Sequence, residues 1–276
     1  MPRDSMTTKL FYRMPAHFGP TPGPRQGPNG EKFADVDTPH SVVASVSFLT
    51  DRAKLEDILP PGFALDGDPV VTIEMRHMTE LEWLAGRGYN TFGVTFPARY
   101  DGTRDHVAAP FLAVLWENLP DPILSGRDEL GFSKIYAELP PPRVLRGRRI
   151  YEAGWLGHGF ATMELSEMKP VQPSALPAPR SGGRLHYKYI PKTGAPGEAD
   201  VAYATFTPPT GYNNVKILSA AQGRGTVQFH RSTWEELPTM AHIVNVLAEL
   251  PQLEMRGATL LETRGAKDLS DQKALA

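Results

Sequence analysis

The chain has no cysteine, almost no net charge and no long apolar segment, and each absence excludes a class of protein. Without cysteine there is no disulfide framework and no thiolate metal site. The 29 basic and 31 acidic side chains leave a net charge of −2, which gives no electrostatic reason to bind nucleic acid or an anionic membrane. The longest apolar run, Val107 to Trp116, contains Pro110 and is shorter than the ~20 residues of a membrane-spanning helix. We therefore expect a small-molecule partner, with no nucleic acid and no membrane.

Other signals are also missing. Arg3 and Asp4 are not followed by the apolar core of a signal peptide, so we expect a cytoplasmic protein. The eight histidines are scattered, and no pair has the spacing of a helical zinc site. We expect no metal ion and no other cofactor.

Proline and glycine are abundant, and they divide the chain into three parts. Residues 1–40 are rich in both and predict an arm with little regular structure, which wraps the domain or a neighbouring subunit. Residues 41–265 carry strand and helix patterns throughout and predict one domain. Residues 266–276 predict a frayed polar tail.

Most of the domain alternates with the period of two that strands have. Helical periodicity is confined to short stretches and to Pro238–Leu250, whose apolar stripe is Met240, Ile243, Val244 and Leu247. Asp101-Gly102 is a typical hairpin turn, and no rhythm of alternating strands and helices is present. This pattern predicts an α+β fold, mostly antiparallel β, whose sheet closes into a barrel or is covered at its edges.

The stretch from Gly126 to Lys134 holds the most informative pattern. A helix that begins at Pro120 ends at Gly131, and Phe132, Lys134 and Tyr136 then share one face of a strand. A lysine between two aromatic residues is either a solvated surface residue or an amine in a poorly hydrated pocket. In the second case desolvation lowers the pKa of the amine and leaves a nucleophile able to form a Schiff base with a ketone. The pattern alone leaves both interpretations open.

This stretch resembles the active-site signature of the acetoacetate decarboxylase family, in which a Gly-Arg-Glu helix end precedes an aromatic residue, a proline and two lysines. The corresponding residues here are Gly126, Arg127, Asp128, Phe132, Ser133, Lys134 and, in place of the second lysine, Ile135. The resemblance, which extends from about Val42 to Arg264, implies that Lys134 forms the Schiff base. The residues expected in the substrate site are Tyr89, Thr91, Trp116, Arg127, Glu129 and Phe132. It also implies a closed antiparallel barrel with a central cavity and a homo-oligomeric assembly.

Three departures from the family pattern stand together. Besides Ile135, the family's tyrosine followed two residues later by a glutamate corresponds here to Tyr89 and Thr91. No arginine lies between Lys32 and Val46, where the decarboxylase has its carboxylate-binding arginine. Without a second lysine, any lowering of the pKa of Lys134 must come from burial against groups such as Phe132 and Trp116.

Glu74 falls where the family has a carboxylate in the substrate pocket. It shares a strand face with Val70 and Thr72, opposite an apolar face. It is either a pocket residue that moves a proton or a rim residue that pairs with Arg76 or His77. Should Glu74 prove to be a rim residue, Glu129 or a water is the next candidate for proton transfer.

The resemblance implies an enzyme that condenses Lys134 with the carbonyl of a small keto acid. The protonated imine is an electron sink, so it stabilises the enamine left by loss of carbon dioxide or of an α-proton. Because Thr91 removes a carboxylate, we favour an aldolase-dehydratase acting on a keto acid and an aldehyde over decarboxylation of acetoacetate. A third possibility is a non-catalytic barrel that binds a small acid, with Lys134 as its counter-ion.

Overall fold

The computed structural model of the protein describes residues 12–13, 21–22, 38–176, 183–210 and 213–276. The predicted arm of residues 1–40 lies almost wholly outside these ranges. The strands are β1 Tyr12–Arg13, β2 Thr21–Pro22, β3 His40–Leu49, β4 Phe63–Leu65, β5 Val70–Thr79, β6 Asn90–Asp101, β7 His106–Glu117, β8 Lys134–Tyr136, β9 Arg143–Leu145, β10 Arg148–Trp155, β11 His158–Pro170, β12 Arg184–Pro191, β13 Ala199–Thr207, β14 Lys216–Phe229, β15 Glu254–Arg264 and β16 Lys273–Ala274. The helices and helical turns are α1 Arg52–Glu56, η3 Glu82–Leu84, α2 Pro120–Ser125, η4 Gly126–Leu130, η5 Pro173–Ala175 and α3 Ala241–Ala248.

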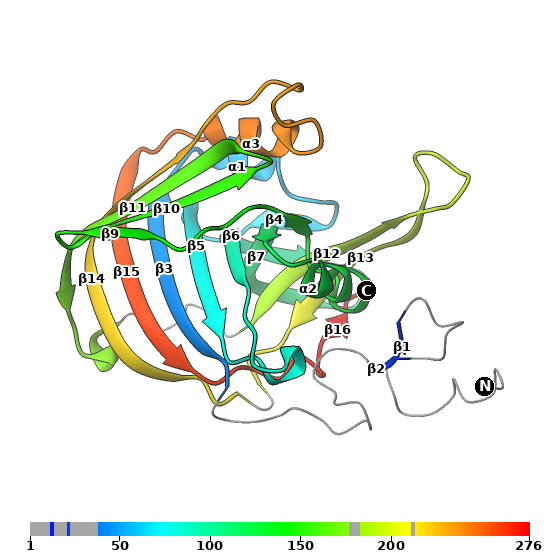
Figure 1. Ribbon diagram of the computed structural model, residues 1–276. Helices are drawn as coiled ribbons and strands as arrows, with labels where there is room; N and C mark the ends of the chain where they lie inside the picture. Colours follow the sequence, from blue (N-terminus) through cyan, green and yellow to red (C-terminus); the bar gives the residue numbers. More distant parts are fainter. Residues whose placement is uncertain (1–11, 14–20, 23–37, 177–182, 211–212) are drawn as a thin grey trace.

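One 14-stranded sheet dominates the described part of the chain, in the order β16-β13-β12-β7-β6-β5-β3-β15-β14-β11-β10-β9, with β4 on β6 and β8 on β7. Its pairs are antiparallel except β7 with β8 and β7 with β12 (Figure 1). The predicted mostly antiparallel α+β class is therefore confirmed.

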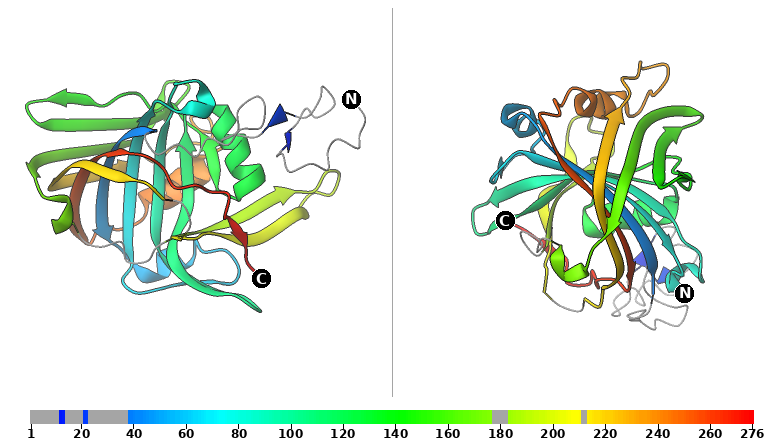
Figure 2. Two further views of the ribbon diagram at one scale, coloured as in Figure 1. Left: turned by 90° about the horizontal axis from the view of Figure 1, so that it is seen from below. Right: turned by 90° about the vertical axis from the view of Figure 1, so that its left-hand side faces the viewer.

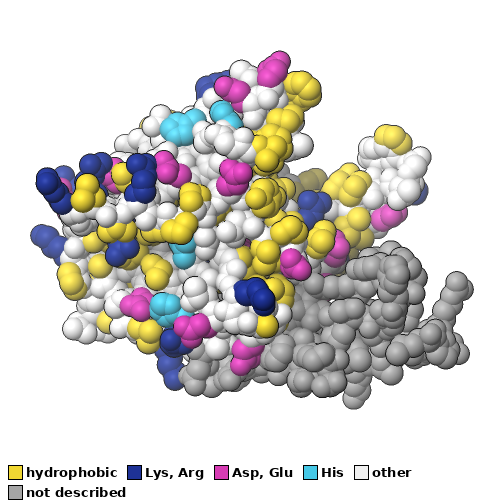
Figure 3. All heavy atoms as spheres, in the orientation of Figure 1, with side chains coloured by type: hydrophobic (Ala, Val, Ile, Leu, Met, Phe, Trp, Pro, Cys, Tyr) yellow, Lys and Arg dark blue, Asp and Glu magenta, His cyan; other side chains and the backbone are white. Residues whose placement is uncertain are grey.

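The predicted closed barrel is wrong, because the sheet is open. Its two end strands, β9 and β16, are not hydrogen-bonded to each other, and β12 joins β7 through the single pair Leu185↔Phe111. The β12–β13 hairpin extends away from the body of the sheet in the views of Figures 1 and 2. Both end strands are short, and Lys and Arg side chains gather over the end formed by β9 and β10 (Figure 3), which is how natural sheets protect open edges.

The core lies on one face of the sheet and is formed by alternate residues of its strands. In β5, Val71, Ile73 and Met75 are at most 1% exposed, as the period of two predicts. Aromatic rings fill the centre: Trp116 lies 5.2 Å from Phe160 and 5.7 Å from Phe92, measured between ring centroids. The helix α3 covers one end of this core (Figure 1).

The C-terminal segment packs on the sheet and is not the frayed tail that its polar composition predicts. β16 pairs with β13, and Leu275 is 7% exposed with its backbone N–H donated to the carbonyl of Ala204. The backbone N–H groups of Arg104 and Asp105 both donate to the carbonyl of Ala276. The buried Leu275 side chain and these backbone hydrogen bonds help to anchor the segment. No helix in the described ranges has the length and apolar character to cross a bilayer.

We predict that Leu275→Ala lowers the free energy of unfolding by about 2 to 4 kcal/mol, the usual cost of truncating a buried leucine. Urea denaturation measures this change. Leu253→Ala is the matched control, because Leu253 is 63% exposed and its loss is expected to cost less than about 0.5 kcal/mol. If the urea denaturation midpoints of Leu275→Ala and the unaltered protein are equal, the Leu275 side chain does not anchor the C-terminal segment.

Candidate active site

The amine of Lys134 is buried at the start of β8. The residue is 6% exposed, and its Nζ donates to the carbonyl of Pro122 at 3.0 Å and lies 2.9 Å from Oε1 of Glu117. Nζ also lies 5.3 Å from the centroid of the Phe132 ring. Of the two interpretations of this lysine, the structure therefore supports the buried amine.

The local sequence explains how the amine comes to be buried. Pro120 opens α2, and the chain continues through one π-helical turn, η4, to Gly131, whose φ of +81° suits glycine. Gly126 has a second role, because a Cβ atom there would lie 2.5 Å from Cδ of Lys134 and 2.6 Å from its Nζ. Glycine at this position thus lets the helix end lie directly on the lysine side chain.

The end of the turn η4 is held by residues that are distant in sequence. The hydroxyl of Thr205 and the side-chain amide of Gln272 both donate to the carbonyl of Leu130, each at 2.9 Å. The segment 272–275 therefore supports the turn that carries the signature.

Glu117 is a site residue that sequence reasoning missed. It ends β7, is 1% exposed, and its Oε2 has no hydrogen-bond partner among the described residues. Burial raises the pKa of Glu117, and the nearby Lys134 only partly offsets this. The only available signal was a carboxylate that directly follows the longest apolar run of the chain.

The strand register places Glu74 and Lys134 on one face of the sheet. Glu74 pairs with Gly93, Gly93 with Leu115, and Leu115 with Lys134. Three strand spacings of about 4.8 Å separate the backbones of Glu74 and Lys134 by ~14 Å. Glu74 shares the face of Lys134 but is not an immediate neighbour of the amine.

Glu74 has an arginine partner on its own strand. Nε and Nη2 of Arg76 lie 3.3 and 3.2 Å from its Oε1. Burial acts to raise the pKa of Glu74, but Arg76 and Arg184 outweigh it and lower the pKa below its usual value. Glu74 thus pairs with Arg76 on the face that carries Lys134, and its role in proton transfer stays a prediction.

Thr91 lies in the neighbouring row of residues. It is 7% exposed and pairs with Arg76 on one side and with Glu117 on the other. A carboxylate, that of Glu117, therefore lies directly across from Thr91 on the next strand.

His186 on β12 is the second residue that sequence reasoning missed. Its ring stacks on Phe132 with centroids 3.9 Å apart, and its Nε2 lies 3.0 Å from the hydroxyl of Thr207. Burial, together with the nearby charges of Arg184 and Lys134, lowers the pKa of His186 well below 6.5. His186 is therefore neutral at pH 7 and extends the stack that begins with Phe132.

The remaining predicted site residues lie in different parts of the structure. Trp116 is paired with Ile135, and its indole N–H donates to the sulfur of Met240 in the core, so it does not pack on Lys134. Tyr89 packs against Trp83 at 6.3 Å and does not line the pocket described below. Arg127 is exposed and donates to the carbonyl of Lys134 at 3.4 Å. Glu129, in the same turn, is partly buried.

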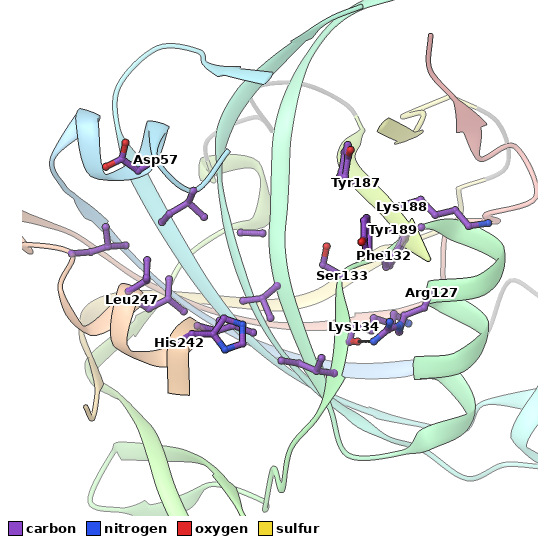
Figure 4. Close-up of a pocket in the computed structure, with 18 of the residues that line it drawn as sticks. Asp57, Arg127, Phe132, Ser133, Lys134, Tyr187, Lys188, Tyr189, His242 and Leu247 are labelled. Atoms are coloured by element: carbon purple, nitrogen blue, oxygen red, sulfur yellow. Dashed lines mark hydrogen bonds between the residues drawn. The ribbon is translucent and has the colours of Figure 1, made fainter. Parts of the chain in front are cut away.

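A pocket of about 570 Å³ lies beside the signature, a volume suited to a small ligand. Figure 4 shows Phe132, Ser133 and Lys134 on one side of this pocket and Leu247 of α3 across from them. Among the described residues, no group of three or more histidine, aspartate or glutamate side chains is arranged to hold a metal ion.

Comparison with known proteins identifies the family. The model of the acetoacetate decarboxylase family matches residues 13–263, so the chain belongs to this family. No curated protein sequence matches the chain.

Solved structures share the fold at low sequence identity. One structure of acetoacetate decarboxylase has a TM-score of 0.73 at 15% identity, covering 100% of this chain and 98% of the other. Acetoacetate decarboxylase from Legionella pneumophila subsp. pneumophila has a TM-score of 0.66 at 20% identity, with 98% of each chain covered. The enduracididine biosynthesis enzyme MppR complexed with pyruvate has a TM-score of 0.63 at 16% identity, covering 92% of this chain and 98% of the other. MppR complexed with the condensation product of pyruvate and imidazole 4-carboxaldehyde has a TM-score of 0.62 at 17% identity, covering 93% and 98%.

We predict that Gly126→Ala displaces the amine of Lys134 and lowers its modification by a small amine-selective reagent or a carbonyl compound at least tenfold. The added methyl group would overlap Cδ, Cε and Nζ of the lysine. Mass spectrometry of the peptide that contains Lys134 measures the modification. Gly159→Ala is the matched control, since no atom lies within 4 Å of a Cβ placed there. An unchanged modification rate in Gly126→Ala would show that the close approach does not position the amine.

Proposed function

We propose that this protein is a Schiff-base-forming carbon–carbon lyase that acts on a small keto acid through Lys134. The observation that carries the proposal is the buried Lys134 amine in the family signature, held 2.9 Å from a carboxylate whose pKa burial raises. A buried lysine beside such a carboxylate can lose its proton to that partner and become a nucleophile. The cytoplasmic location and the homo-oligomer expected from the sequence remain part of this proposal.

The proposed chemistry assigns the proton transfers to Glu117. Glu117 takes a proton from the ammonium of Lys134, and the amine adds to the keto carbon to give a carbinolamine. Glu117 returns the proton to the carbinolamine hydroxyl, which leaves as water and gives the protonated imine. Loss of an α-proton from the imine gives an enamine, whose carbon attacks the aldehyde. Loss of water from the adduct and hydrolysis of the imine release an unsaturated keto acid and regenerate the amine. The overall change is keto acid plus aldehyde to unsaturated keto acid plus water.

Two observations favour this aldolase-dehydratase reaction. MppR, which shares the fold, is complexed with pyruvate in one structure and with a condensation product of pyruvate and an aldehyde in another. Thr91 also replaces the carboxylate of the family pattern, and Ile135 replaces its second lysine.

Decarboxylation of a β-keto acid is the second candidate, and two observations favour it. Glu117 pairs with Thr91, so a carboxylate is present one strand away from the family position. Structures of acetoacetate decarboxylase are also among the similar folds. Measuring carbon dioxide release from acetoacetate, beside product formation from pyruvate and an aldehyde, separates the two reactions.

We predict that borohydride reduction in the presence of pyruvate adds one reduced keto-acid mass to the peptide that contains Lys134. Lys134→Ala is expected to abolish the adduct. Lys192→Ala is the matched control, because Lys192 is an exposed lysine paired with Glu198. The absence of any adduct with a panel of keto acids would overturn the Schiff-base mechanism and leave the third possibility, a non-catalytic protein that binds a small acid.

We predict that Glu117→Gln lowers turnover about 100- to 10,000-fold, the usual contribution of a general base, and that Glu74→Gln lowers it less than tenfold. We expect this difference because Glu117 contacts the amine of Lys134. Glu74 is instead paired with Arg76 and lies far from Lys134. Steady-state kinetics with the substrate identified by trapping measures both variants. If Glu74→Gln loses as much turnover as Glu117→Gln, Glu74 is the proton-transfer group.

A further inference from the structure

The β12–β13 hairpin contacts the signature mainly through side chains. In the strand ladder, β12 joins β7 by the single pair Leu185↔Phe111. Next to this pair, the imidazole of His186 stacks on Phe132, with ring centroids 3.9 Å apart and an angle of 10° between the ring planes. The centroid of the Phe132 ring lies 5.3 Å from Nζ of Lys134. A side chain of the hairpin is therefore separated from the amine by one aromatic ring.

A chain of hydrogen bonds leads from the same imidazole back to the signature. Nε2 of His186 lies 3.0 Å from the hydroxyl of Thr207, and both residues are buried. The Thr207 hydroxyl lies 2.7 Å from Oε1 of Gln272. Nε2 of Gln272 in turn lies 2.9 Å from the carbonyl oxygen of Leu130. His186 is thus connected to the signature twice, by its stack on Phe132 and by hydrogen bonds that end two residues earlier.

The donors and acceptors of this chain can be assigned in only one way. A carbonyl oxygen only accepts, so the amide nitrogen of Gln272 faces Leu130 and the amide oxygen faces Thr207. The amide oxygen also only accepts, so the Thr207 hydroxyl donates its single proton to it. The hydroxyl must then accept from His186, which places the imidazole proton on Nε2. Nδ1 of His186 therefore carries no proton.

The same assignment keeps the imidazole neutral. Nδ1 has no hydrogen-bond partner among the described residues, and His186 is 0% exposed. A second proton on Nδ1 would be a buried donor without an acceptor, which is costly. The neutral ring can stack on Phe132 without bringing a second cation close to Lys134.

We infer that His186 is a positioning residue for Lys134, an inference that rests on the proposed function. Its imidazole is held in one tautomer and one orientation by Thr207, and it fixes the Phe132 ring beside the amine. The fixed ring keeps water from the amine and holds the amine in place for its attack on the keto carbon. In this role His186 transfers no proton and acts only through Phe132.

The first test breaks the hydrogen-bond chain at Thr207, because valine has nearly the shape of threonine but no hydroxyl. Pyruvate and borohydride label the peptide that contains Lys134, and mass spectrometry measures the labelling rate at pH 7. We expect Thr207→Val to lower this rate about tenfold, since a small displacement of a reacting group has a large effect on rate. Thr207→Ser keeps the hydroxyl and is expected to label at the rate of the unaltered protein.

The second test removes the ring. His186→Leu leaves one face of Phe132 without its stacked partner, and we expect its labelling rate to fall at least as far as that of Thr207→Val. His106→Leu is the matched control, because His106 is an exposed histidine at the start of β7, and its rate is expected to be unchanged.

Two further measurements separate positioning from a purely structural role. Nitrogen-15 NMR of the unaltered protein is expected to show His186 with its proton on Nε2 and none on Nδ1, and this measurement needs no variant that folds. The melting temperature of each variant is measured beside its labelling rate. A purely structural contact would lower the melting temperature and leave the labelling rate of the folded protein unchanged.

The outcomes distinguish this inference from the proposed function. If Thr207→Val and His186→Leu are labelled as fast as the unaltered protein, or if NMR places the proton on Nδ1, His186 does not position Lys134, although the Schiff-base function stands. If the unaltered protein forms no adduct with any keto acid, the proposed function fails. The same variants are then compared with a small amine-selective reagent, and equal modification of Lys134 in all of them would overturn the positioning role as well.

Discussion

A lysine amine that is removed from water must be given new partners, and the region around Lys134 is built to meet this requirement. Its ammonium group has a backbone carbonyl of α2 on one side and a carboxylate of β7 on the other. Leaving such a charge without partners would cost several kcal/mol. The proline-rich start of α2, the π-helical turn and the bare Gly126 all follow from bringing the helix end close enough to supply one of these partners.

This arrangement leaves the buried carboxylate of Glu117 incompletely hydrogen-bonded. One of its oxygens has no hydrogen-bond partner among the described residues, which is unusual for a group 1% exposed. Burial raises the pKa of Glu117, and its carboxylate lies 2.9 Å from the amine of Lys134, close enough for a proton to pass between them. Buried polar atoms without hydrogen-bond partners are most often found at functional sites, and the Glu117 carboxylate beside Lys134 fits that pattern.

Sequence reasoning predicted the strands, the helix end and the role of Gly131, because each depends on nearby residues. It missed Glu117, because the approach of Glu117 to Lys134 depends on the parallel pairing of β7 with β8, and no local pattern reports which strands become neighbours. His186 was missed for the same reason, since β12 is distant in sequence and reaches this region through its pairing with β7 and its packing on Phe132. Barrel closure was predicted wrongly because strand periodicity specifies which residues face the core but not whether the last strand meets the first.

The hydrogen bond from Gln272 to the carbonyl of Leu130 links residues 142 positions apart. During synthesis, the turn that carries the signature leaves the ribosome long before the segment that supports it exists. At 5 to 20 residues per second the interval is on the order of ten seconds. Throughout that interval the nascent chain has Lys134 but lacks the hydrogen bond at Leu130, so the surroundings of Lys134 reach their final form only near the end of translation.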